Sequence, residues 1–119
     1  MTERTDPVHI ADLPEVVTRY LGAHDAKDVA TAVASLAPEA TVTDDGRTYR
    51  DPAAIRSWLE QTSTEYTYTT TLIGAERDGP DQYTVVQHLE GDFPGGQVDL
   101  RYRFALDRHQ RITRLAIAP

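Results

Sequence analysis

Apolar residues recur at helical spacing in the first part of the chain and at every second position in its second half. From Leu13 to His24 the candidate inward positions are separated by 3, 1, 3, 1 and 3 residues, which is one continuous stripe on a helix. Asp12 stands where an N-cap is expected, with Pro14 in the first turn. The stripe consists of Leu13, Val16, Val17, Tyr20, Leu21 and His24.

Two more helices and a short strand are predicted before the middle of the chain. Residues 27–36 are expected to be helical, with Pro38 ending the helix, and residues 40–44 to form a short strand. Asp51-Pro52 combines an N-cap with a proline at the first helical position, so a third helix should run from there to about Gln61. Its inward residues would be Ile55, Trp58 and Leu59.

The rest of the chain has the composition and the alternation of β-strands. The expected strands are 66–75, 82–91, 98–106 and 111–118. In the third of them, apolar residues alternate strictly with charged residues and one alanine, which is typical of a strand with one buried face. Three helices followed by a meander predict an α+β fold, in which the helices pack on one face of a curved antiparallel sheet. A cavity between helices and sheet is the default ligand site of such a domain.

Length and charge limit the classes of protein that come into question. A chain of 119 residues is expected to form a single domain, here residues 12–119 after a flexible arm, 1–11. A net charge of −7 lacks the basic footprint of nucleic-acid binding, and no apolar run is long enough to span a membrane. The first residues show no signal-peptide pattern, so we expect a cytoplasmic protein.

Asp44 and Tyr20 are the candidates for chemistry. Removing a proton next to a carbonyl requires a carboxylate base and a hydrogen-bond donor for the oxygen that becomes negative. Asp44 at a strand end and Tyr20 on an inward helical face could supply both groups. Two structural alternatives stay open: Asp44-Asp45-Gly46 is also an ordinary turn sequence, and Tyr20 is also an ordinary core aromatic.

Further side chains are expected to shape the pocket. Trp58 and Tyr49 would form aromatic walls, and Gln87 is the polar member of an apolar strand face, next to Tyr102. His24 either reaches the cavity mouth or interacts with the C-terminal end of its helix. The remaining predicted pocket residues are Val16, Leu100 and Leu115. The histidines lack metal-ligand spacing and there is no cysteine, so we expect no metal site and no thiol nucleophile.

Four segments of the chain resemble the nuclear transport factor 2-like superfamily, in particular its bacterial SnoaL-like branch. They are residues 16–20, 40–44, 51–58 and 102–104. The resemblance implies a cone-shaped α+β fold. Compared with ketosteroid isomerases of this superfamily, Tyr20 matches the oxyanion donor and Asp44 the general base. Leu100 and Leu59 stand where those enzymes have a second donor and a supporting tyrosine, so the resemblance implies an altered site.

The resemblance also implies a class of ligand and an oligomeric state. It implies acid/base conversion, without a cofactor, of a small hydrophobic carbonyl compound of polyketide-like or steroid-like character: isomerisation, cyclisation or epoxide hydrolysis. A homodimer is expected from the same resemblance. The alternatives are a non-catalytic module of this fold that binds a ligand, and an interaction domain that uses the outer sheet face carrying Asp99, Arg101, Arg103 and Arg114.

Overall fold

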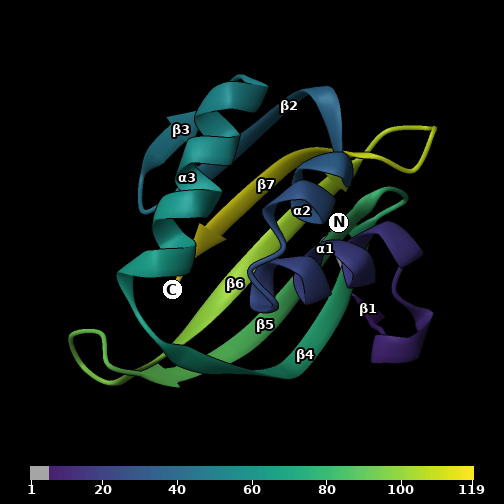
Figure 1. Cartoon of the computed structure of the whole chain (residues 1–119). Coiled ribbons are helices and arrows are strands. Elements are labelled where there is room, and N and C mark those ends of the chain that lie inside the picture. Colours follow the sequence, from purple (N-terminus) through teal and green to yellow (C-terminus); the bar gives the residue numbers. More distant parts are fainter. Residues whose placement is uncertain (1–5) are drawn as a thin grey trace.

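The computed structural model describes residues 6–119, which form three α-helices, one short 3-10 helix and seven strands (Figure 1). The helices are η1 (Ile10–Asp12), α1 (Glu15–Asp25), α2 (Val29–Ala34) and α3 (Pro52–Glu65). The strands are β1 (Asp6–Pro7), β2 (Leu36–Asp44), β3 (Arg47–Tyr49), β4 (Tyr68–Gly79), β5 (Gln82–Gly91), β6 (Gln97–Leu106) and β7 (Ile112–Ala118). The predicted α+β class is confirmed.

The strands of the described residues form one sheet in the order β1-β4-β5-β6-β7-β2-β3. Consecutive strands from β4 to β7 pair antiparallel, as the predicted meander requires. The sheet differs from the predicted antiparallel sheet at one place: β2 pairs parallel with β7 and places Asp44 opposite Ile117. The chain reaches β7 from β2 only after crossing the sheet, and such a crossover permits parallel pairing.

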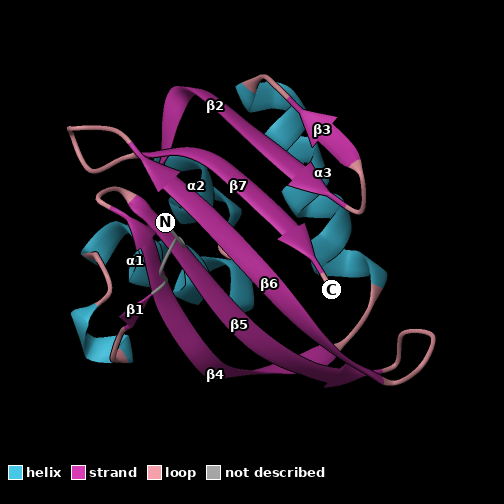
Figure 2. Cartoon of the chain, turned by 180° about the vertical axis from the view of Figure 1, so that it is seen from behind, coloured by secondary structure: helices cyan, strands magenta, loops and turns pink. Residues whose placement is uncertain are grey.

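The three α-helices cover one face of the sheet, and the opposite face is bare (Figures 1 and 2). The helical stripe predicted from Leu13 to Leu21 is buried, as are the inward residues Ile55, Trp58 and Leu59 of α3. Tyr102, Phe104 and Leu106 bury the inner face of β6. Helices and sheet therefore share one apolar core. Within the described part of the chain, no helix is both long and apolar enough to cross a membrane.

The segment before α1 is more regular than the loose arm predicted for residues 1–11. β1 pairs with β4, and the backbone N–H of Val8 donates to the Ala75 carbonyl at 3.0 Å. Residues 1–5 lie outside the described residues. Asp12 belongs to η1 and not to the cap of α1, which begins after the extended Pro14. The apolar stripe located the helix, whereas the capping residue was assigned wrongly.

The second helix begins later than predicted because the backbone at Lys27 is left-handed, with φ of 61°. Asp28 then caps α2 by accepting a hydrogen bond from the Thr31 backbone N–H. β2 begins at Leu36, so Pro38 lies inside a strand and does not follow a helix. The β2–β7 register is irregular between Leu36 and Thr41, a place where a missing N–H costs no ladder hydrogen bond.

The hairpin between β2 and β3 was not predicted and determines where Tyr49 lies. Asp45 and Gly46 both have positive φ, 52° and 79°, which suits a two-residue turn joining antiparallel strands. Tyr49, predicted in a loop, is instead the last residue of β3. α3 continues to Glu65, beyond the predicted end at Gln61, and its last turn includes hydroxyl-to-carbonyl hydrogen bonds from Thr62 and Thr64.

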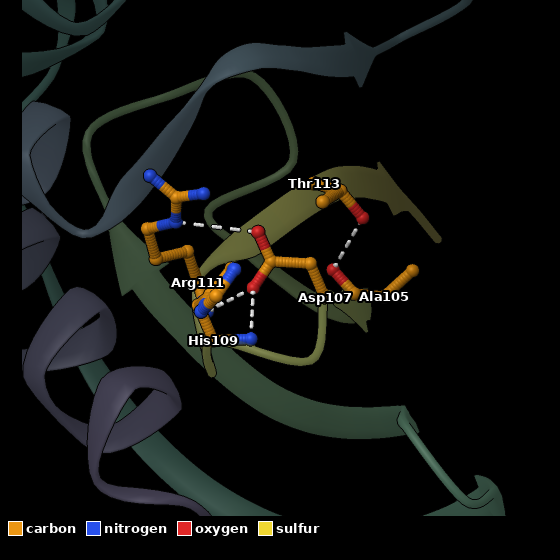
Figure 3. A network of polar contacts seen from close by, with 5 residues as sticks. All are labelled: Ala105, Asp107, His109, Arg111 and Thr113. Atoms are coloured by element: carbon orange, nitrogen blue, oxygen red, sulfur yellow. Dashed lines mark hydrogen bonds and ion pairs between the residues drawn. The ribbon is translucent and has the colours of Figure 1, made fainter.

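The turn between β6 and β7 is held by one carboxylate (Figure 3). Oδ1 of Asp107 accepts the backbone N–H groups of His109 and Arg111 at 2.9 and 3.0 Å, and Oδ2 accepts Arg111 Nε at 3.2 Å. The Thr113 hydroxyl donates to the Ala105 carbonyl beside it. These bonds, led by that from the Arg111 backbone, lower the pKa of Asp107.

Candidate functional site

A cavity of about 750 Å³ lies at the end of the sheet where α3 finishes. Its walls come from the ends of α1 and α3, from the β2–β3 hairpin, from β4, β5, β6 and β7, and from the β5–β6 connection. This volume is within the range of pockets that hold drug-sized ligands. The lining residues are His24, Asp44, Asp45, Arg47, Tyr49, Trp58, Gln61, Thr62, Glu65, Tyr66, Tyr68, Leu89, Phe93, Pro94, Gln97, Val98, Leu100, Tyr102 and Ile117.

The carboxylate of Asp44 is held on the cavity wall by Trp58. The indole N–H of Trp58 donates to Asp44 Oδ2 at 2.9 Å, linking the end of β2 to the middle of α3. The tryptophan side chain is buried and also packs against Tyr49, with ring centroids 6.0 Å apart. One oxygen of the carboxylate is therefore fixed by a rigid donor, and Oδ1 has no hydrogen-bond partner among the described residues.

Burial raises the pKa of Asp44 above its ordinary value of 3.8. The hydrogen bond from Trp58 stabilises the ionised form and acts in the opposite direction, whereas the nearby carboxylates of Asp45 and Glu65 raise the pKa further. A carboxylate with a raised pKa is a stronger base than a solvated one, and such groups are common at catalytic sites. Chemically, Asp44 is suited to accept a proton from a bound molecule.

His24 and Tyr20 form a second polar pair, on the side of the cavity covered by α1. The Tyr20 hydroxyl lies 3.0 Å from His24 Nδ1, one helical turn away. The tyrosine is completely buried, which raises its pKa well above 10, and burial lowers the pKa of His24 to about 4. At neutral pH both groups are therefore uncharged. The ring of His24 meets those of Trp58 and Tyr102 edge to face, at 5.6 and 6.3 Å.

Two further tyrosines contribute hydroxyl groups to the inner wall. Burial raises the pKa of Tyr102, and the hydrogen bond with Gln87 opposes that shift. Burial also raises the pKa of Tyr68, with a smaller effect of Asp25 and Asp44. Both phenols stay protonated at neutral pH and can act as hydrogen-bond donors. Gln87, predicted to shape the pocket next to Tyr102, is buried behind this wall and does not line the cavity.

The structure brings together most of the residues singled out in the sequence. Those that line the cavity are Asp44, His24, Tyr49, Trp58, Leu100 and Tyr102. Those that lie behind the wall are Tyr20, Gln87, Val16 and Leu115, of which Val16 and Leu115 are buried in the apolar core. Tyr20 was expected to present its hydroxyl to a ligand, but the hydroxyl is bonded to His24.

The mouth of the cavity was missed by the sequence analysis. Phe93, in the connection between β5 and β6, packs edge to face on Tyr66 and Tyr68, with centroids 6.1 and 6.4 Å away. Gly91, at the end of β5, has no room for a side chain, since a Cβ there would lie 2.3 Å from the Thr67 carbonyl oxygen. The clustering of aromatic residues at 66, 68 and 93 was a usable signal. Among residues 6–119, no group of three or more His, Cys, Asp or Glu side chains could hold a metal ion.

Neither protein-family models nor curated proteins give a match to this chain. Solved structures do. A protein of Sinorhizobium meliloti described as a "putative polyketide cyclase" is 31% identical, with a TM-score of 0.85, over 93% of this chain and 100% of its own. The chain belongs to the nuclear transport factor 2-like (SnoaL-like) superfamily. The resemblance expected from residues 16–20, 40–44, 51–58 and 102–104 is thereby confirmed.

More distant structures share the fold of this SnoaL-like protein. A Catenulispora acidiphila protein with a ketosteroid isomerase-like fold, crystallised with trimethylamine, is 21% identical with a TM-score of 0.76. The match covers 89% of this chain and 85% of that one. A nuclear transport factor 2-like protein of unknown function from Cytophaga hutchinsonii is 11% identical, with a TM-score of 0.65, over 87% and 86% of the two chains. At these identities the likeness concerns the fold alone.

Proposed function

We propose that this SnoaL-like protein binds a small hydrophobic carbonyl compound and transfers a proton on it, with Asp44 as the general base or acid. The reaction class is cofactor-independent isomerisation, cyclisation or epoxide opening of a polyketide-like or steroid-like molecule. The observation that carries the proposal is the Asp44 carboxylate. It lies on the wall of a cavity that is lined in part by aromatic residues, is fixed through Oδ2 by Trp58, and has a raised pKa.

The walls of the cavity support a flat, apolar ligand. Trp58, Tyr49, Tyr102 and Phe93 offer aromatic faces and edges, and Leu100 adds an aliphatic contact. The matched protein from Sinorhizobium meliloti, described as a putative polyketide cyclase, is consistent with a ligand of this class.

Charge further restricts the ligand. The lining carboxylates are Asp44, Asp45 and Glu65, and Arg47 is the cationic side chain among the lining residues. With His24 neutral, the negative groups prevail, so a ligand that is itself an anion would be repelled. A neutral ketone or epoxide is compatible with this wall.

Binding can be tested through Trp58, which is the only tryptophan of the chain and lines the cavity. Progesterone, a neutral enone, serves as the probe, and saturable quenching of tryptophan fluorescence is the expected result. Proton transfer is then followed as uptake of deuterium next to the carbonyl of progesterone in D₂O, by NMR. The wild type should exchange these protons faster than Asp44→Asn by about 10²-fold or more.

Asp44→Asn isolates the base because the asparagine oxygen can still accept the Trp58 hydrogen bond. Asp81→Asn is the matched control: Asp81 is exposed in the β4–β5 turn, at the opposite end of β5 from the cavity mouth. It should exchange like the wild type. If the wild type binds progesterone saturably but exchanges its protons no faster than Asp44→Asn, the result would favour the alternative function, a non-catalytic ligand-binding module. Absence of binding would overturn the proposed ligand class.

We also propose a homodimer that pairs through the bare outer face of the sheet. A second hollow, of about 560 Å³, lies on this face between Arg101, Arg103 and Arg114 on one side and Glu76 and Asp78 on the other. A face with both signs of charge can pair with its own copy around a two-fold axis. Light scattering should give a dimeric mass for the wild type and a monomeric mass for Arg103→Glu. A monomeric wild type at all concentrations would contradict the proposal.

A further inference from the structure

We infer that His24, through its Nε2–H group, is the hydrogen-bond donor that the cavity presents to a ligand oxygen, and that Tyr20 fixes the tautomer of the ring. The inference rests on the proposed function for the identity of the ligand. It assigns to His24 the role that the family resemblance implied for Tyr20. Its basis is the position of the two side chains: Tyr20 lies in the core, and His24 lies between Tyr20 and the cavity.

Tyr20 cannot reach a ligand directly. Its side chain is fully buried, and among the described residues its hydroxyl has one hydrogen-bond partner, His24 Nδ1 at 3.0 Å. His24 is the member of the pair that lines the cavity. The ring of His24 therefore separates the hydroxyl from any bound molecule.

The buried hydroxyl determines which nitrogen of His24 carries the proton. A phenol that keeps its proton must donate it to an acceptor, because a buried unpaired donor is costly. Nδ1 of His24 is the available acceptor and must therefore be unprotonated, which leaves the proton of the neutral ring on Nε2. The opposite arrangement, with Nδ1–H donating to the tyrosine oxygen, would leave the phenol proton without a partner.

Nε2 is free to act on a ligand. Within residues 6–119 it makes no hydrogen bond, yet no buried nitrogen or oxygen of the described side chains is left unpaired. Nε2 must therefore be accessible, and the cavity is the space that His24 lines. The edge-to-face contacts with Trp58 and Tyr102 restrict the orientation of the ring. The result is a pre-oriented donor whose ring contacts Trp58, the residue that holds Asp44.

A neutral imidazole donor suits the chemistry proposed for Asp44. When the base removes a proton next to a carbonyl, negative charge develops on the oxygen, and a fixed N–H group can stabilise it. The imidazole keeps its proton and forms no imidazolium, as in enzymes that use neutral histidine as an electrophile. Tyr20 does not touch the ligand and is a positioning residue.

The tautomer can be measured in the resting protein, independently of any reaction. Long-range ¹H–¹⁵N spectra of the full ¹⁵N-labelled chain distinguish the protonated from the unprotonated ring nitrogen, with His24 assigned by its loss in His24→Gln. Wild-type His24 should show unprotonated Nδ1 and protonated Nε2 from pH 5 to 8. Tyr20→Phe should produce a mixture of tautomers, and Tyr83→Phe, which removes a hydroxyl on β5 away from the cavity, should not.

The contact with a ligand is tested with progesterone in the same spectra and in the deuterium exchange assay. Progesterone should shift the Nε2 resonance of His24. His24→Leu should slow exchange by about 10²-fold, and His24→Gln, which keeps an N–H donor, should retain most of the rate. Tyr20→Phe should lower the rate less than His24→Leu, with unchanged progesterone affinity.

The two proposals fail in different ways. A proton on Nδ1 in the wild type, or an Nε2 resonance that does not move when progesterone is bound, overturns the role of His24 and leaves Asp44 as the base. A different result would overturn the catalysis and leave His24 as a binding donor. In that case His24 has the expected tautomer and its Nε2 resonance shifts with progesterone, but deuterium exchange in the wild type is no faster than in Asp44→Asn. Near-ultraviolet circular dichroism of each variant shows whether the core around Tyr20 has kept its packing.

Discussion

The indole N–H of Trp58 donates to Oδ2 of Asp44 at 2.9 Å, and this bond stabilises the ionised carboxylate against the effect of burial. Replacing Trp58 by phenylalanine keeps an aromatic ring on α3 but removes the donor. We expect the pKa of Asp44 to rise further in Trp58→Phe, as measured by NMR titration of the Asp44 carboxyl carbon. Tyr49→Phe, on the same wall, is the control and should leave the pKa of Asp44 unchanged.

Asp44 should reduce the stability of the fold at neutral pH. Its pKa in the folded chain is above the ordinary 3.8, so the native state binds a proton that the unfolded state releases, and the free energy of unfolding falls as pH rises through that window. Asp44→Asn should therefore raise the free energy of unfolding at pH 7 slightly, because solvent screens the partly exposed carboxylate. Urea unfolding should show the gain vanishing below pH 3.8. An equal gain at pH 3 and pH 7 would contradict the assignment.

His24 should make the fold sensitive to mild acid. Its pKa is lowered from 6.5 to about 4 by burial, so between these values the unfolded chain takes up a proton that the native chain does not. The free energy of unfolding should fall by up to about 3 kcal/mol as pH drops from 6.5 to 4. In urea titrations at several pH values, His24→Gln should lose much less stability over this range.

His88 offers a control of opposite sign for that experiment. The hydrogen bond with Asp99 raises its pKa, so His88 stabilises the fold at low pH and the contribution is lost as pH rises through the folded pKa. His88→Gln should therefore steepen the loss of stability in acid, whereas His24→Gln makes it shallower. Identical pH profiles for the two variants would show that the burial of His24 is not the cause.

The negative lining groups predict selection against anionic ligands. Cholate and progesterone share a steroid skeleton, but cholate carries a carboxylate. We expect cholate to bind roughly 10-fold or more weakly in the Trp58 fluorescence titration, because the carboxylates of Asp45 and Glu65 repel it. Glu65→Gln should reduce the difference in affinity between progesterone and cholate, and added salt should reduce it as well. Equal affinities in low salt would count against the electrostatic argument.

Asp107 is expected to maintain the β6–β7 turn. Asp107→Ala removes the acceptor of two backbone N–H groups and of the Arg111 guanidinium, so the urea midpoint should fall. Asp107→Asn keeps one acceptor oxygen and should cost less. Because the pKa of Asp107 is lowered, its stabilisation is present above the unfolded pKa and disappears as pH falls through the folded value. The wild type and Asp107→Ala should therefore converge in stability at low pH.

The helices and strands with strong hydrophobic periodicity could be predicted from the sequence. Which strands pair with one another could not be predicted throughout. The stripe from Leu13 to Leu21 and the alternation along β6 are local signals that located a helix and a strand on their correct faces. The parallel pairing of β2 with β7 depends on residues about 70 positions apart and leaves no local trace. Pro38 was therefore assigned to a helix end although it lies in a strand.

For the site, the sequence predicted most of the residues, but not which of them reach the cavity and which lie behind its wall. Helical spacing places Tyr20 and His24 on one face, yet which of them reaches the cavity depends on how α1 lies across the sheet. In the same way, Trp58 was predicted as an apolar wall, and its donor role required the end of β2 to face α3. Hydrogen bonds between elements are thus the part that pattern analysis alone could not supply.

The parallel strand pair has a consequence for synthesis on the ribosome. β2, which carries Asp44, is joined to the rest of the sheet only through β7, and Ile117 of that strand is the direct neighbour of Asp44. A nascent chain that has emerged only as far as β6 can form the meander of β4, β5 and β6, but it lacks the strand that connects β2 to it. Such an intermediate leaves β6 as an unpaired edge, so the delay before β7 emerges is a period in which the chain depends on chaperones or on rapid elongation.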